Sequence, residues 1–124
     1  MGLIHVTVSL KQPGLETKAY EALFLVDSGA TDSMAPGSEL RRVGIQPISR
    51  MSYELANGNL VEYPFGLAQI EFMGEVTAGR VIFGPEGTEP ILGVTALESV
   101  GIVIDPTNHT LKRLPAIPLK RAVA

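Results

Sequence analysis

Cysteine is absent from the 124 residues of this chain. Its absence excludes a disulfide framework, a thiol nucleophile and a thiolate metal site, so packing alone must hold the fold together. Long apolar runs are missing too. No stretch approaches the ~20 residues that a membrane-spanning helix needs, and the N-terminus lacks a basic segment followed by an apolar one. We therefore expect a soluble, cytoplasmic protein with no membrane partner.

Basic runs are equally scarce. The formal net charge is −3 and charged residues make up 19% of the chain, so no cluster of Lys and Arg is long enough to follow a phosphate backbone. Nucleic acid is therefore not an expected partner. His5 and His109 have no other ligand at metal-binding spacing, and no serine lies in a Gly-x-Ser-x-Gly context. We expect no metal site, no cofactor and no serine-hydrolase site.

Hydrophobic residues make up 45% of the chain, which at this length is enough for one packed core and a single domain over residues 1–124. Alternating apolar and polar residues, or short apolar runs, predict most of the elements as strands. The expected strands cover residues 4–11, 18–26, 51–55, 60–61, 68–72, 76–83 and 102–104. Many short strands of this kind indicate an all-β fold that is closed or nearly closed.

Two short helices and one hairpin complete this expectation. Residues 36–44 read as a helix that begins near Pro36 and ends at Gly44, where a left-handed residue is favoured. Thr95 and Glu98 have the spacing of a capping box, which predicts a second helix between Gly93 and Gly101. The pair Asn57-Gly58 predicts a tight hairpin turn between two strands.

The aspartates are concentrated in one place. The chain has only three, and Asp27 and Asp32 share one loop. Residues 23–26 are apolar on both faces, so the strand should carry Asp27 into a partly desolvated site. Gly29 permits a tight turn in which backbone N–H groups hold the carboxylate. Asp27-Ser28-Gly29 alone would also suit an ordinary turn.

The stretch from Leu25 to Thr31 resembles the signature of aspartic proteases, in which hydrophobic residues precede Asp-Ser/Thr-Gly-Ala. The run 90–93, Pro-Ile-Leu-Gly, is similar to the element that packs behind the catalytic loop in the retropepsin-like members. Asn57-Gly58 lies where that family places its flap. This resemblance covers roughly residues 4–115 and implies a retropepsin-like β-barrel with one lobe per chain. Thr31 stands where viral members commonly have an acidic residue, so their internal ion pair is not expected.

The resemblance also implies the site residues. The catalytic set would be Asp27, Ser28 and Gly29, with Ser28 bonding a carboxylate. Residues bordering the substrate would be Ala30, Thr31, Asp32, Ala56, Asn57, Gly58, Ile91 and Leu92.

The chain has a single Asp-Ser-Gly motif, because Asp105 is followed by Pro106-Thr107 and reads as a strand-ending turn. Two chains must then supply the catalytic pair, which predicts a homodimer that hydrolyses peptide bonds. The alternative is a catalytically silent domain of this type that serves as a peptide-binding or dimerisation module.

Overall fold

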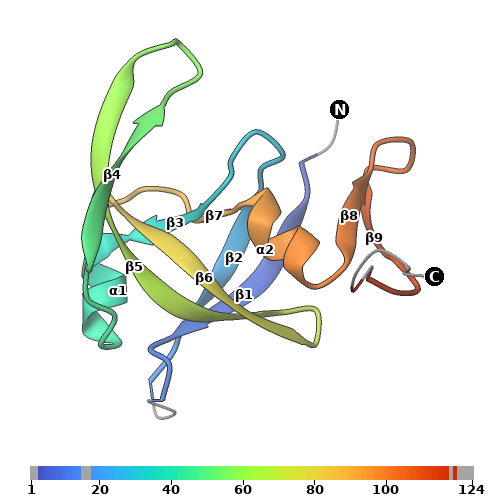
Figure 1. The fold of residues 1–124 in the computed structure, drawn as a ribbon, viewed down its shortest axis with the longest axis horizontal. Helices are drawn as coiled ribbons and strands as arrows, with labels where there is room; N and C mark the ends of the chain where they lie inside the picture. The colour runs from blue at the N-terminus through green and yellow to red at the C-terminus, as the bar shows by residue number, and fades with distance from the viewer. Residues whose placement is uncertain (1–2, 15–17, 118, 120–124) are drawn as a thin grey trace, which may run out of the picture.

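Strands dominate the computed structural model, which describes residues 3–14, 18–117 and 119 (Figure 1). The strands are β1 (His5–Lys11), β2 (Tyr20–Val26), β3 (Ser33–Pro36), β4 (Ser49–Glu54), β5 (Leu60–Phe72), β6 (Glu75–Gly84), β7 (Ile91–Leu92), β8 (Ile102–Asp105) and β9 (Thr110–Arg113). The helices are α1 (Gly37–Arg42) and α2 (Val94–Ser99). The prediction of a mainly β chain with two short helices is confirmed.

The main sheet closes on itself. Its strand order is β1-β2-β7-β3-β6-β5-β4, and β1 also pairs with β5, so all strands except β4 form a ring. This arrangement agrees with the expected closed or nearly closed β structure. Strand β4 pairs only with β5, and the two form a hairpin that rises away from the ring (Figure 1). Strands β8 and β9 form a separate two-stranded sheet near the C-terminus.

The core lies inside the ring. On β1, Val8 and Leu10 are fully buried and alternate with more exposed neighbours, as the sequence pattern predicts. On β2, Phe24 is fully buried, whereas Leu23 is 59% exposed. The prediction that residues 23–26 are buried on both faces is therefore wrong for Leu23, because that face of β2 points away from the core.

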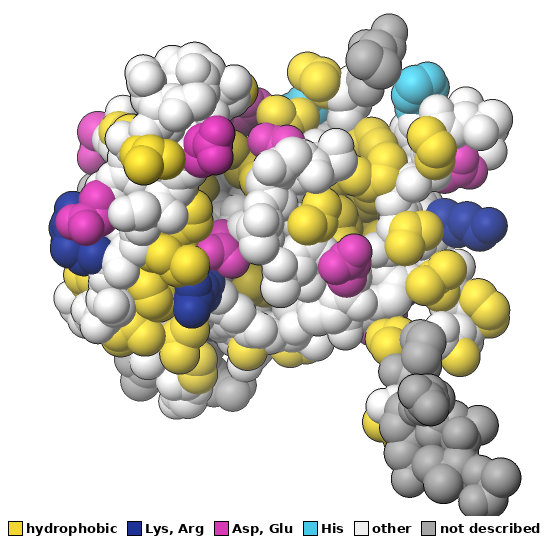
Figure 2. All heavy atoms as spheres, turned by 45° about the horizontal axis from the view of Figure 1, so that its top comes forward, with side chains coloured by type: hydrophobic (Ala, Val, Ile, Leu, Met, Phe, Trp, Pro, Cys, Tyr) yellow, Lys and Arg dark blue, Asp and Glu magenta, His cyan; other side chains and the backbone are white. Residues whose placement is uncertain are grey.

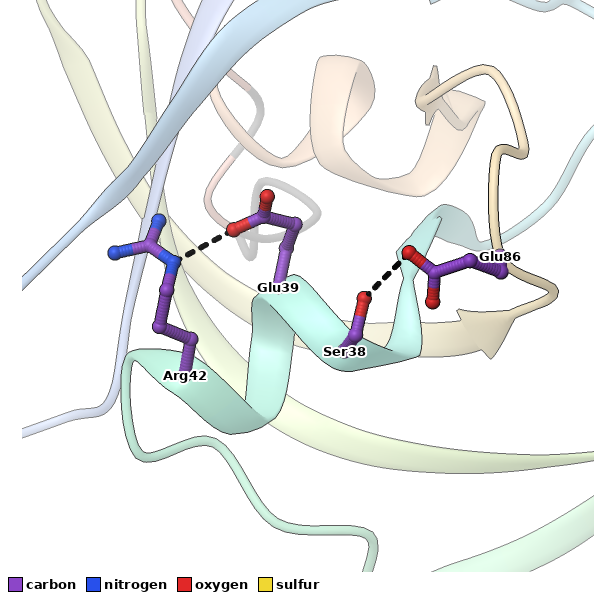
Figure 3. A network of polar contacts seen from close by, with 4 residues as sticks. All are labelled: Ser38, Glu39, Arg42 and Glu86. Carbon is purple, nitrogen blue, oxygen red and sulfur yellow. Dashed lines mark hydrogen bonds and ion pairs between the residues drawn. The ribbon is translucent and has the colours of Figure 1, made fainter.

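Helix α1 confirms the prediction for residues 36–44. Gly44 takes a positive φ of 91° just beyond it, the left-handed conformation that suits glycine after a helix. Figure 3 shows two polar contacts on its surface. The hydroxyl of Ser38 donates to Glu86 over 3.1 Å, which ties the helix to the loop after β6, and Arg42 Nε donates to Glu39 over 2.7 Å.

Strand β5 corrects the prediction of separate runs at 60–61 and 68–72. It is one strand of 13 residues that continues through Pro64 and Gly66, two residue types that ordinarily interrupt strands. The strand changes partners as it goes: its first half pairs with β4, its second half with β6, and Phe65 has partners on both. Because β4 and then β6 pair with it, β5 continues through Pro64 and Gly66 without a break.

The hairpin predicted at Asn57-Gly58 is confirmed, and three residues lie between the paired Leu55 and Asn59. Gly58 has a φ of 86°, the Leu55 N–H donates to the Asn59 carbonyl over 2.8 Å, and Asn57 keeps a negative φ. Met51 and Leu55 are each 41% exposed. The alternation around them therefore does not mark a face on the core, because this hairpin extends beyond the ring.

The predicted capping box of α2 is wrong. The helix begins at Val94 with Gly93 as its N-cap, and no side chain caps it. Backbone carbonyls of the loop after β2 do so instead: the Val94 N–H donates to Ala30 over 2.9 Å and the Thr95 N–H donates to Thr31 over 3.2 Å. Free N–H groups at a helix start need acceptors, and here the loop supplies them. No helix among the described residues is long and apolar enough to span a membrane.

Candidate active site

Pairing between β2 and β7 fixes the position of Asp27. Strand β2 pairs in parallel with β7, with Leu25 opposite Ile91 and Val26 opposite Leu92. One residue further on, the Asp27 N–H donates to the Leu92 carbonyl over 3.1 Å. The end of β2 is therefore fixed by β7 up to the aspartate itself.

The carboxylate of Asp27 is half-buried and held by its own loop. The Gly29 N–H donates to Asp27 Oδ1 over 2.9 Å, and the Ala30 N–H donates to the Asp27 carbonyl over 3.1 Å. A Cβ on residue 29 would lie 3.3 Å from the same carboxylate oxygen. The expectation that glycine lets the backbone hold this carboxylate is confirmed.

Gly93 packs directly behind the loop. A Cβ there would lie 2.6 Å from the Thr31 carbonyl oxygen and 2.7 Å from that of Asp32. Its N–H donates to the hydroxyl of Ser33 over 3.0 Å, and Ser33 is the one buried polar side chain among the described residues. Sequence reasoning missed Ser33, because a lone serine after the motif carries no local signal of burial.

Asp32 contacts the hairpin. Its Oδ2 accepts a hydrogen bond of 2.9 Å from the hydroxyl of Tyr53, which lies on β4. Burial, together with this carboxylate, raises the pKa of Tyr53 to about 12, so the hydroxyl stays a donor at all ordinary pH values. Sequence reasoning missed Tyr53 as well. The contact joins the loop after β2 to the hairpin.

A cleft of about 980 Å³ lies between this loop and the hairpin. Figure 2 shows hydrophobic side chains gathered in the hollow beside the hairpin, interrupted by a few charged ones. The predicted site residues that line it are Asp27, Gly29, Ala30, Thr31, Asp32, Ala56 and Ile91. The structure therefore brings the loop after β2, the start of β7 and one hairpin residue to a single cleft.

Four predicted site residues do not line this cleft. Ser28 is exposed beside Asp27, and no described residue bonds its hydroxyl. Asn57 and Gly58 lie exposed at the tip of the hairpin, beyond the cleft wall. Leu92 is fully buried in the core and contributes its carbonyl to Asp27 instead of its side chain to the cleft.

The remaining wall comes from residues that the sequence did not single out. They are Met34, Met51, Ser52, Tyr53, Glu54, Leu55, Tyr63, Leu67, Gly79, Arg80, Ile82 and Thr95. Most lie on β4, β5 and β6, whose pairing could not be known from local patterns. Only the alternation along these strands hinted that one face of each would be covered or would line a cavity.

Comparison with known families decides the classification. A model described as "Aspartyl protease" matches residues 7–96, which include the loop of Asp27, the hairpin and β7. The chain belongs to the aspartyl protease family. No curated protein sequence matches the chain.

Solved structures similar to this aspartyl protease include two from retroviruses. The simian foamy virus (mac) protease is 17% identical with a TM-score of 0.53, covering 76% of this chain and 91% of its own. The EIAV protease, solved with the inhibitor HBY-793, is 19% identical with a TM-score of 0.56, covering 81% and 89%. The predicted retropepsin-like fold is confirmed.

Asp105 stabilises the turn between β8 and β9 in this aspartyl protease. Its carboxylate accepts hydrogen bonds from the backbone N–H groups of Thr107 and Asn108 and from the Asn108 side chain, over 2.9, 3.2 and 2.9 Å. These donors lower the pKa of Asp105, Asn108 first among them. The prediction of a strand-ending turn is confirmed. No group of three or more potential ligands to a metal ion occurs among the described residues.

Proposed function

We propose that this aspartyl protease is an endopeptidase whose catalytic water is activated by two Asp27 carboxylates, one from each subunit of a homodimer. The observation that carries the proposal is the placing of Asp27. It is half-buried at the wall of a large cleft, held by the Gly29 N–H, in a chain with one Asp-Ser-Gly motif. A second carboxylate must come from a second chain, and a twofold axis beside Asp27 would supply it.

The reaction follows from that pairing. Two carboxylates at contact distance cannot both ionise, and as in aspartic-protease dyads they share one proton. The ionised carboxylate takes a proton from water while the water oxygen attacks the scissile carbonyl carbon, which the protonated carboxylic acid polarises. When the tetrahedral intermediate collapses, the C–N bond breaks and the leaving nitrogen takes a proton from the pair. No acyl-enzyme forms.

The other predicted residues divide by their position. Ala30, Thr31, Asp32, Ala56 and Ile91 line the cleft and would border the bound peptide. Because the peptide must lie across Asp27, these residues would contact it on either side of the scissile bond.

The residues at the margin of the cleft would act from outside it. Ser28 is exposed next to Asp27, so its hydroxyl would be free to bond a carboxylate of the pair. Asn57 and Gly58 would close over the substrate from the hairpin tip.

The substitution Asp27→Asn tests the chemistry, because it removes the carboxylate and keeps the side-chain size. Cleavage of an unfolded protein substrate should fall by at least roughly a hundredfold, the usual contribution of general acid–base catalysis. Asp105→Asn is the matched control and should keep nearly full activity, since Asp105 lies in a turn outside the cleft. Equal cleavage by wild type and Asp27→Asn would refute the proposal, and peptide binding without cleavage by wild type would favour a silent binding module.

A further inference from the structure

The cleft wall has more acidic than basic side chains. Asp27, Asp32 and Glu54 are its carboxylates, and Arg80 is the one basic residue in the lining among the described residues. Asp27 is assigned to the chemistry and Asp32 accepts the Tyr53 hydroxyl. None of the ion pairs in the described part of the chain includes Arg80. A guanidinium in a mostly apolar cleft therefore lacks a carboxylate partner.

Apolar and weakly polar groups hold Arg80 in place. Its guanidinium carbon lies 4.6 Å from the centre of the Phe65 ring, which favours a cation over its face. Its Nη1 donates to the sulfur of Met51 on the hairpin over 2.5 Å. It also hydrogen-bonds the Tyr53 hydroxyl, and its charge and this bond lower the pKa of that hydroxyl against the larger effects of burial and Asp32. The side chain thus extends from β6 beneath β4.

These contacts occupy only part of the guanidinium edge. Arginine carries five N–H donors in a planar fork, and a thioether sulfur is only a weak acceptor. The ring of Phe65 accepts the face of the guanidinium and none of its edge. A fixed, planar fork with free edge donors is the arrangement that binds a carboxylate through two parallel hydrogen bonds.

We infer that Arg80 is a specificity-determining residue that binds the side-chain carboxylate of a glutamate or aspartate in the substrate. The inference rests on the proposed function for turnover, but the binding it describes does not need catalysis. Arg80 is exposed, so water screens part of the attraction, but an arginine already held by Phe65 and Met51 loses little freedom on binding. The Asp32 carboxylate accepts the Tyr53 hydroxyl but keeps its charge, so with Glu54 it opposes the attraction, and the direct contact with Arg80 must outweigh that repulsion.

Paired peptides test the inference. Short peptides, acetylated and amidated so that no terminal carboxylate is present, would carry glutamate or glutamine at one position around the cut. Wild type should cleave the glutamate peptide roughly tenfold better at one such position, a typical effect of one charge-assisted contact. Arg80→Met, which keeps an apolar stem over Phe65, should abolish that preference, and Arg80→Glu should transfer it to lysine. Raising the salt concentration should weaken the wild-type preference.

The matched control is Arg41→Met. Arg41 also lies over a phenylalanine ring, 5.0 Å from the centre of Phe83, but it does not line the cleft. It should keep the full glutamate preference.

The same peptides, bound to Asp27→Asn samples and followed by fluorescence anisotropy, separate the two proposals. Preferential binding of glutamate peptides that requires Arg80 supports the inference even if wild type cleaves nothing. Cleavage by wild type with equal rates for glutamate and glutamine at every position overturns the inference and leaves the proposed function standing. A glutamate preference that survives in Arg80→Met also overturns it, and absence of both binding and cleavage overturns both proposals.

Discussion

Among the glycines at and behind the cleft, Gly93 has the least room for a side chain. It is not needed for a left-handed turn, since its φ is −84°. It is needed because the backbone of Thr31 and Asp32 passes directly over it, and its N–H must reach the Ser33 hydroxyl at the same time. Sequence pattern correctly singled out the run 90–93 by resemblance, but the reason for the glycine is a contact between segments about 60 residues apart.

Gly93→Ala should destabilise the fold and weaken activity. The added methyl would lie 2.6–2.7 Å from backbone atoms of Thr31 and Asp32, which cannot rotate away. Overpacking of this kind typically costs about 1–3 kcal/mol, and it would displace the loop that holds Asp27. The midpoint of urea unfolding measures the loss. Gly79→Ala serves as the control, because the nearest atom to its Cβ is 4.0 Å away, and it should change stability by less than about 0.5 kcal/mol. Equal midpoints for the two variants would contradict the close packing.

At the level of elements, local patterns predicted the strands well, but they did not predict which strand faces are buried. The alternation of Val8 and Leu10 marks a buried face because β1 lies in the ring. A similar alternation at Met51 and Leu55 does not, since β4 projects from it. Nothing within a strand records whether the facing side is core, cleft or solvent. Tyr53 and Arg80 were missed for this reason, as their partners lie on other elements.

The Tyr53–Asp32 hydrogen bond joins the hairpin to the loop after β2, so Tyr53→Phe should loosen the hairpin. Loss of one such bond costs about 0.5–1.5 kcal/mol of stability, and the KM for peptides should rise more than kcat falls if the hairpin closes on the substrate. Tyr63→Phe is a matched control: Tyr63 lies beside Tyr53 in the same wall, and its hydroxyl makes no hydrogen bond with a described residue. Unchanged KM in Tyr53→Phe would show that the bond does not hold the hairpin.

Because of Tyr53, the free energy of unfolding should also depend on pH in the alkaline range. The folded state raises the pKa of Tyr53 from 10.0 to about 12, so between these values the folded chain binds more protons than the unfolded one. The stabilisation from this group is therefore fully present below about pH 10 and is lost as pH rises toward 12. Urea midpoints of wild type should fall more steeply over that range than those of Tyr53→Phe, in which Tyr20, whose pKa burial also raises, still contributes. Parallel curves would contradict the assignment.

For the whole molecule, the closing of the sheet is what places two distant segments beside Asp27. The contact of β1 with β5 and the insertion of β7 between β2 and β3 bring residues 27–32 and 91–95 together, and β4–β5 then covers them. The sequence motif and its resemblance to a family could predict this arrangement. Composition and periodicity alone could not, because strand order is set by long-range pairing. The proposed mechanism also requires a second carboxylate, which a partner subunit would supply.

Mixed dimers test whether two chains share one site. Wild-type and Asp27→Asn chains, unfolded together in equal amounts and refolded, should pair at random, so roughly a quarter of the dimers would contain two intact Asp27 residues. If both carboxylates are required, only those dimers cut, whereas independent subunits would retain about half of the activity. A parallel mixture of wild-type with Asp105→Asn chains should stay close to fully active, which controls for losses during refolding.

Specific activity should also fall on dilution near the dissociation constant of the dimer, because assembly and formation of the site are then one event. Activity proportional to the wild-type fraction, together with constant specific activity on dilution, would mean that a single chain suffices and that the paired-carboxylate mechanism is wrong.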